Sequence, residues 1–319
     1  LARKRTRLSL SPRLRWRLDQ IRRKTSGAFI GQKDPPRPKL CPACGTLVGA
    51  TATRCHQCGA SLTFSLAAAS KSLGRLMPAT SPATYAILTV SCVIYVITLA
   101  LTIRRSGLEA PGGGLLGLGN LGGISGEILL RVGSLPWPYD NLQPWRLVTA
   151  VFLHGGLLHI AFNMWVLMDI GPPIEELYGS ARYLFAYVAA GIGGFVLSSA
   201  MGNLSVGGSG SVLGLCGVVL AVTMGARSAQ AQMFRATVVR LLIYVAIIGF
   251  LPLGGFIGAV DNSAHLAGLA TGFALGKILT DRPPATAEER RRAYLLGWGT
   301  ALAVAASFVM AALTLLRVM

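Results

Sequence analysis

The stretch Ser205-Val206-Gly207-Gly208-Ser209-Gly210-Ser211-Val212-Leu213-Gly214 opens an apolar run that contains no charged residue as far as Ala226. Its central serine, Ser209, stands between glycines at the head of a segment apolar enough to enter a membrane. Glycine permits backbone conformations that are closed to other residues, and it leaves room beside the hydroxyl for another backbone segment. Polar groups inside apolar spans are costly, so they are candidates for function by default.

A second polar residue, His265, lies 56 positions further on, within another apolar segment. A serine hydroxyl is a poor nucleophile until a base removes its proton, and histidine is suited to that task near neutral pH. We predict that Ser209 and His265 meet inside the membrane as nucleophile and base. The alternatives are a serine that caps a helix and a histidine that bonds across helices. Small residues on both segments would permit a close approach, namely Gly210, Gly214, Ala264, Gly268 and Gly272.

A third pair, His159 and Asn163, is spaced i, i+4, so both side chains are expected on one side of a helix. If that side faces Ser209, they could donate hydrogen bonds to an oxyanion. The alternative is a role in hydrogen bonding between helices. His154, five residues before His159, is expected elsewhere on the same helix, where it would steady the junction between loop and helix.

The composition is that of a polytopic membrane protein. The chain has 319 residues, of which 52% are hydrophobic and only 13% charged. About 20 apolar residues cross a hydrocarbon core, and that length predicts an all-α protein with seven spans. They are Ala83–Ile103, Leu147–Ile170, Tyr183–Met201, Ser209–Ala226, Ala236–Phe256, Ser263–Leu279 and Tyr294–Leu316.

The net charge of +18 is concentrated at the N-terminus, because residues 1–40 hold thirteen Lys/Arg against two Asp. We interpret residues 1–38 as a basic cytosolic tail and linker that is drawn to the anionic headgroups of the lipid bilayer. Nucleic-acid binding is disfavoured, because the excess of positive residues on the cytosolic side already predicts such a tail. The Lys/Arg placement favours a cytosolic N-terminus, and Ser209 and His265 then lie at one level near the outer ends of their helices. The first outer loop, Arg104–Arg146, is apolar enough to lie in the membrane interface, with Trp137, Tyr139 and Trp145 as anchors.

Two C-x-x-C pairs, each followed by glycine, precede the spans, and they contain Cys41, Cys44, Cys55 and Cys58. Four thiolates at this spacing predict a closed, structural zinc site. Residues 39–63 resemble the zinc-ribbon family. Two disulfides are the alternative, but they need an oxidising compartment, and His56 is a further alternative ligand. A linker over residues 64–82 would join the ribbon to the membrane region, and the ribbon would be available to bind a cytosolic partner.

Three motifs together resemble the rhomboid intramembrane serine proteases. Gly207–Gly210 matches the family's G-x-S-G nucleophile element, and Ala264–Gly272 matches its A-H-x-x-G-x-x-x-G helix. His154–Asn163 matches its H-G-x-x-x-H-x-x-x-N element, and Trp145-Arg146 matches the tryptophan-arginine pair of its first loop.

The resemblance implies a six-helix core over residues 83–280, followed by a cytosolic loop and a seventh transmembrane helix over residues 281–319. It implies that Ser209 and His265 form a catalytic dyad, supported by Gly207, Gly208 and Gly210. By the same resemblance, His159 and Asn163 line an oxyanion hole, and His154 is structural. The implied reaction is hydrolysis of peptide bonds in or beside transmembrane segments of membrane proteins, without a catalytic cofactor. The size of the chain fits a bacterial inner membrane.

Leu213 departs from the family pattern, which has an aromatic residue four positions after the serine. Asp261 could suggest a triad, but the family works as a dyad. A metal-dependent intramembrane protease would need an H-E-x-x-H helix, which neither histidine pair provides. An inactive relative that escorts membrane clients and a channel are the remaining alternatives.

Overall fold

The structure, a computed structural model, describes residues 38–41, 46–57, 59, 62, 81–106, 122–136, 143–203, 205–250, 260–279, 281 and 284–318. These residues fall into a small N-terminal unit and a larger helical unit, which are described separately. The basic tail up to residue 37 and most of the predicted linker lie outside the described residues.

In the N-terminal unit, strands β1 (Lys39–Leu40) and β2 (Leu47–Val48) pair antiparallel. Cys41 directly follows β1, and its amide donates a hydrogen bond to the carbonyl of Thr46 (2.7 Å). Cys41 and Cys55 are both buried. Cys44 and Cys58, the other two predicted zinc ligands, lie outside the described residues.

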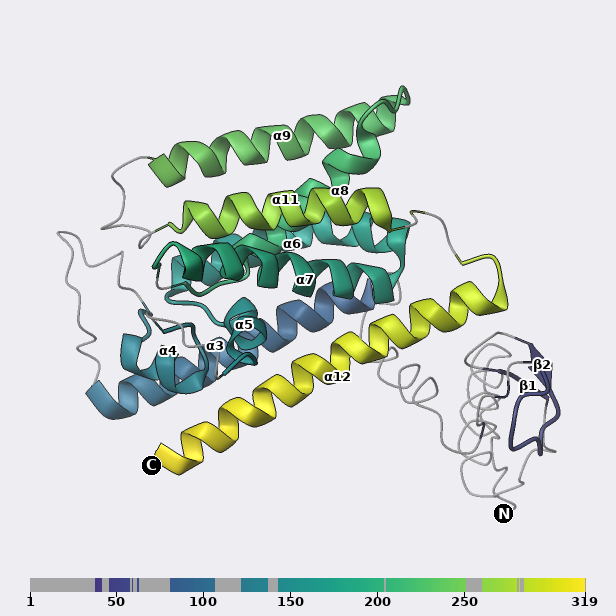
Figure 1. Cartoon of the computed structure of the whole chain (residues 1–319), viewed down its shortest axis with the longest axis horizontal. Coiled ribbons are helices and arrows are strands. Elements are labelled where there is room, and N and C mark those ends of the chain that lie inside the picture. The colour runs from purple at the N-terminus through teal and green to yellow at the C-terminus, as the bar shows by residue number, and fades with distance from the viewer. Residues whose placement is uncertain are drawn as a thin grey trace, which may run out of the picture. The chain divides into compact units, whose positions relative to one another are not determined.

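The larger unit is helical (Figure 1). Its elements are α3 (Pro82–Ser106), α4 (Gly126–Val132), α5 (Arg146–Thr149), the 3-10 helix η1 (Ala150–Phe152), α6 (Leu157–Tyr178), α7 (Ser180–Ala200), α8 (Ser209–Thr223), α9 (Ala229–Phe250), α11 (Asn262–Ile278) and α12 (Ala287–Val318).

Five of the described helices, α3, α6, α7, α9 and α12, are long and apolar enough to cross a membrane. The chain is therefore an integral, multi-pass membrane protein. α8 is apolar but shorter, at 15 residues, and α11 has 17. Each predicted span overlaps one of these seven helices, although the end of the fifth span, beyond Phe250, lies outside the described residues. The number of complete crossings stays a prediction.

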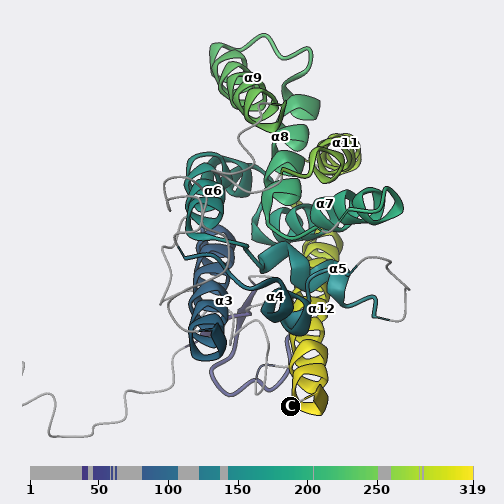
Figure 2. The same ribbon diagram turned by 90° about the vertical axis from the view of Figure 1, so that its left-hand side faces the viewer.

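Helix α8 is the core of this unit. It packs against α11, α7, α6 and α9, and Figure 2 shows it enclosed among them. Every residue from Gly210 to Val219 is buried, which is what a helix apolar on all sides requires. α12 lies across α7, α5 and α4, with α11 on the other side of α7 (Figure 1). The helix that begins at Ser209 is therefore held by its neighbours on most sides.

The predicted second span, Leu147–Ile170, begins ten residues too early. The structure instead has α5, η1 and an extended residue, Leu153 (φ −84°, ψ 150°), before α6 begins at Leu157. Gly155-Gly156 separates the two parts, and Gly156 is also extended. The residues from Ala150 to Leu153 are apolar because they are packed in the protein interior, each at most 2% exposed. An apolar run of this kind has the same composition as the start of a span.

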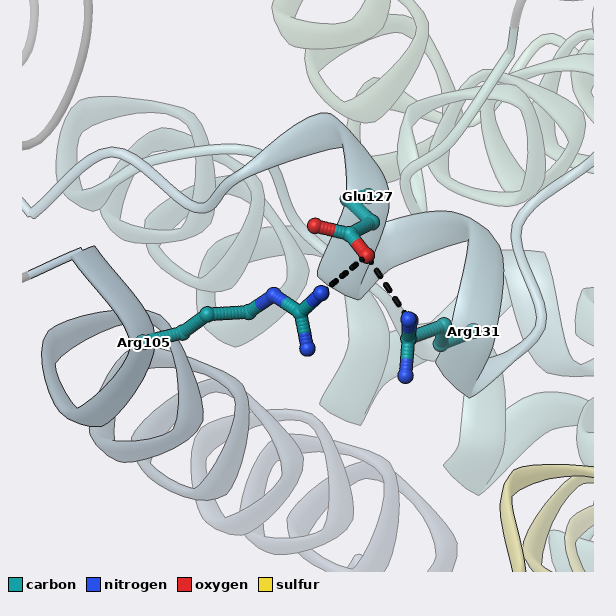
Figure 3. Close-up of polar contacts among 3 residues, drawn as sticks. All are labelled: Arg105, Glu127 and Arg131. Atoms are coloured by element: carbon teal, nitrogen blue, oxygen red, sulfur yellow. Dashed lines mark hydrogen bonds and ion pairs between the residues drawn. The ribbon is translucent and has the colours of Figure 1, made fainter. Parts of the chain in front are cut away.

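The described part of the first loop is folded. The guanidinium of Arg146 donates hydrogen bonds to the carbonyls of Leu130 (2.6 Å) and Ser134 (2.7 Å). Arg105 at the end of α3 and Arg131 of α4 both pair with Glu127 of α4, each at 2.8 Å (Figure 3). The location of this first loop in the membrane interface stays a prediction. Two of its predicted anchors, Trp137 and Tyr139, lie outside the described residues.

Candidate active site

Ser209 is the first residue of α8, and two glycines shape the turn that leads to it. Gly207 has a φ of +129°, which favours glycine. Its amide donates a hydrogen bond to the carbonyl of Ala150 (3.0 Å), so the turn is tied to η1. A Cβ on Gly207 would lie 2.6 Å from Cε1 of His159, and one on Gly208 would lie 2.7 Å from Oη of Tyr187. Neither position has room for a side chain.

Close packing of α8 and α11 brings His265 to Ser209. The backbone of Gly268 lies against the carbonyl of Gly210, and that of Gly272 against the carbonyl of Gly214. The Nε2 atom of His265 lies 2.8 Å from Oγ of Ser209, within hydrogen-bonding distance. Both side chains are half-buried. The predicted contact between the Ser209 hydroxyl and the His265 imidazole is therefore present in the structure.

No third group completes a triad within the described residues. The Nδ1 atom of His265 is buried and has no hydrogen-bond partner there. The carboxylate of Asp261 is occupied elsewhere, because it accepts hydrogen bonds from the amide of Ala264 (3.0 Å) and from the hydroxyls of Ser198 and Ser263. Asp261 is the N-cap of α11 rather than a partner of the imidazole.

His159 and Asn163 lie one turn apart on α6. The His159 ring lies beside Gly207, as the Cβ distance above shows. Asn163 is buried, and its Nδ2 donates a hydrogen bond to the carbonyl of His159 (2.9 Å). An amide carries two hydrogens on Nδ2, so one remains for another acceptor.

His154 lies in the segment before α6, so the expectation that it shares a helix with His159 is wrong. The physical reason is the break at Gly155-Gly156. Its ring is buried and packs edge-on against the ring of His159, with centroids 5.2 Å apart. It is therefore adjacent to the site.

Two buried polar residues were not predicted from the sequence, one beside the site and one near the other end of α6. Tyr187 of α7 is fully buried, with its hydroxyl directed at Gly208 behind the nucleophile. Glu175 of α6 is also buried, and it accepts hydrogen bonds from the amides of Ala83 (2.8 Å) and Thr84 (2.7 Å) at the start of α3. A polar residue within an apolar run was the available signal for Tyr187. That signal is absent for Glu175, because Glu176 stands next to it.

The helical unit resembles known proteins of one family. Residues 141–282 match the family model described as "Rhomboid domain". RHOMBOID-like protein 6, mitochondrial, of Arabidopsis thaliana is 34% identical over 179 residues, which are 55% of this chain and 57% of that protein. Rhomboid protease GluP of Bacillus subtilis (strain 168) is 39% identical over 130 residues, 40% of this chain and 25% of that protein.

A fungal protein, Rhomboid-type serine protease 2 of Emericella nidulans, is 34% identical over 151 residues, 46% of this chain and 29% of that protein. These alignments span between a quarter and somewhat more than half of each relative. Ser209, His265, His159 and Asn163 all lie in the segment that matches the family model. The matches support the rhomboid family for this membrane protein.

Proposed function

We propose that the chain is an intramembrane serine endopeptidase that hydrolyses peptide bonds in or next to the transmembrane segments of other membrane proteins. The observation that carries the proposal is the 2.8 Å separation of Ser209 Oγ and His265 Nε2. The reaction follows from the ordinary chemistry of such a pair. His265 takes the hydroxyl proton as Oγ attacks the scissile carbonyl, and then gives that proton to the leaving amine. Water, activated by the same imidazole, hydrolyses the acyl-enzyme.

The start of α8 is suited to hold the developing oxyanion. Ser209 is the first residue of the helix, where backbone amides have no partner within the helix and the helix dipole favours negative charge. We assign His159 and the second amide hydrogen of Asn163 as additional donors. Removing one such donor from an enzyme costs roughly 3 kcal/mol of transition-state stabilisation.

The orientation follows from the charge distribution. We propose that the N-terminus is cytosolic and that the protein lies in a bacterial inner membrane. The site would then open toward the side of the membrane away from the cytosol. Arg227, Arg235 and the cluster Arg290–Arg292 would then lie on the cytosolic side.

The proposal is tested with purified protein in proteoliposomes and a single-span model substrate. We expect wild-type protein to cleave the substrate and to be labelled by a fluorophosphonate probe, and Ser209→Ala to do neither. Ser211→Ala is the matched control, since that hydroxyl lies on the same helix, is fully buried and has no hydrogen-bond partner among the described residues. Labelling that survives Ser209→Ala would contradict the assignment. Substrate that co-purifies with wild-type protein but is never cleaved would instead indicate an inactive protein that escorts clients.

We also infer a structural zinc ion in the N-terminal unit. Two buried cysteines, Cys41 and Cys55, support this inference. The β1–β2 hairpin also supports it, because its first strand ends directly before Cys41. The amide of Gly59 donates a hydrogen bond to the carbonyl of Cys55 (2.9 Å), the first cysteine of the second C-x-x-C sequence. Thiolates are the ligands that a structural zinc site prefers.

Metal analysis of the full chain tests this inference. We expect about one zinc per chain, lost in Cys41→Ser and Cys44→Ser. Cys92→Ser on α3, whose thiol is exposed, is the matched control. Zinc content unchanged by the first two substitutions would remove the assignment.

A further inference from the structure

Asp169 is a carboxylate in the middle of a span. It lies twelve residues after the start of α6 and nine before its end. Its side chain is exposed, and it makes no hydrogen bond or ion pair with any described residue. A carboxylate at this depth is poorly accommodated by lipid, so a group that faces it is expected to donate hydrogen bonds or carry positive charge.

The exposed neighbours of Asp169 are large and aromatic. Phe162 and Trp165 precede it by seven and four residues, so the three side chains lie on one side of α6. They are 37% and 65% exposed, and their rings meet edge-on with centroids 5.8 Å apart. The opposite side of the helix is buried and includes Ile160 and Leu167. We call Phe162, Trp165 and Asp169 the α6 outer face.

We propose that the α6 outer face docks the transmembrane segment of a substrate, and that Asp169 selects segments carrying a lysine or arginine at the matching depth. The proposal rests on the proteolytic function above and names its substrate class. Charge is the argument for this occupant, because acyl chains offer the carboxylate no partner and anionic headgroups repel it. The aromatic rings supply the apolar part of the contact, as large side chains do at interfaces.

The position of Asp169 relative to the candidate site sets a register. Asp169 follows His159, which lies beside the nucleophile turn, by ten residues. At 1.5 Å per residue, that is about 15 Å along the helix. A helical substrate lying along α6 would therefore carry its basic residue roughly ten residues from the scissile bond. If the substrate is extended next to the scissile bond, fewer residues separate that bond from the basic residue, because each extended residue spans about 3.3 Å.

A lysine scan tests the register. One lysine is moved through successive positions of a single-span substrate on the side of the scissile bond that enters the membrane, and initial cleavage rates are measured in proteoliposomes. We expect wild-type protein to prefer one window by about 3- to 20-fold, the range of single polar contacts between helices in membranes. In Asp169→Asn, the initial cleavage rate should no longer depend on the position of the lysine. Asp169→Lys should shift the preference to a substrate with aspartate in the same window.

Glu176→Gln is the matched control, since its carboxylate is also exposed and lies seven residues further along α6, near the helix end. It should leave the profile unchanged. Binding of the same lysine series to Ser209→Ala, measured by energy transfer in liposomes, gives a readout that does not depend on turnover.

The outcomes separate the two proposals. Cleavage that is lost in Ser209→Ala but independent of lysine position would overturn the role of Asp169 and leave the protease standing. A binding window that depends on Asp169 without any cleavage would keep the docking face and overturn the protease. A change of oligomeric state in Asp169→Asn, with no window in either assay, would show that a second copy of the chain covers this face and would also overturn the proposal.

Discussion

The backbone of Gly272 on α11 lies directly against the carbonyl oxygen of Gly214 on α8. The two helices therefore touch through their backbones, one turn beyond the equivalent contact of Gly268 with Gly210. This packing sets the distance between α8 and α11, and with it the 2.8 Å separation of Ser209 and His265.

Gly272→Ala should therefore damage both stability and activity. The added Cβ would overlap the Gly214 carbonyl, which cannot move aside as a flexible side chain could, so the helices must separate. Overpacking of this kind costs roughly 1–3 kcal/mol, and we expect cleavage to fall at least tenfold beyond the loss of folded protein. Thermal unfolding in detergent and initial cleavage rates measure the two effects.

Gly299→Ala on α12 is the matched control, because a Cβ there meets no atom within 4 Å. Alanine is the better helix former, so this variant should be as stable as wild type or slightly more so. Equal behaviour of the two variants would show that backbone contact does not limit the approach of α8 and α11.

The seven helices and the meeting of Ser209 with His265 could be predicted from the sequence, because single polar residues stand out in runs that otherwise lack them. The start of α6 could not, since the buried segment ending at Leu153 is as apolar as a span. The contacts of Arg146 also escaped prediction. Its guanidinium bonds to backbone carbonyls 12 and 16 residues away, and every residue carries a carbonyl, so no side-chain pattern marks the acceptors.

Glu175 should be far more important to stability than Glu127. The residue is 2% exposed, and its carboxylate accepts hydrogen bonds from the start of α3 and from Ser180 Oγ (2.6 Å) at the start of α7. Leaving those donors unpaired in Glu175→Ala should cost about 3 kcal/mol or more. Glu127→Ala removes only the half-exposed pairs of Figure 3 and should cost at most about 1 kcal/mol. Unfolding in mixed micelles compares them, and similar losses would contradict this difference.

Asp261, the N-cap of α11, should make the stability of the fold depend on pH in the acidic range. Burial tends to raise the pKa of Asp261, but hydrogen bonds from Ser198, Ser263 and the Ala264 amide outweigh it, so the pKa is lowered. A carboxyl whose folded pKa lies below its unfolded value of about 3.9 stabilises the fold fully above that value. This contribution is lost as the pH falls through the folded pKa.

Asp261→Asn separates charge from capping, since asparagine is as good an N-cap as aspartate. We expect the stability difference between wild type and Asp261→Asn to be constant near neutral pH and to shrink below about pH 4. Asp261→Ala should lose about 1 kcal/mol more, because it also removes the cap. A difference that instead grows with acid would mean that the carboxylate is destabilising in the folded state.

Arg146 should not tolerate lysine. Its guanidinium holds the Leu130 and Ser134 carbonyls and Oε1 of Gln143 (2.6 Å), and it lies over the Trp145 ring at 4.8 Å. A lysine ammonium keeps the charge but lacks the planar fork that reaches several acceptors and stacks on an aromatic ring. We expect Arg146→Lys to cost about 2 kcal/mol and to speed hydrogen exchange in residues 126–134. Arg131→Lys is the control, since that guanidinium pairs with the half-exposed Glu127 at the surface. If both variants exchange at the wild-type rate, the first loop is held by its apolar contacts rather than by the Arg146 side chain.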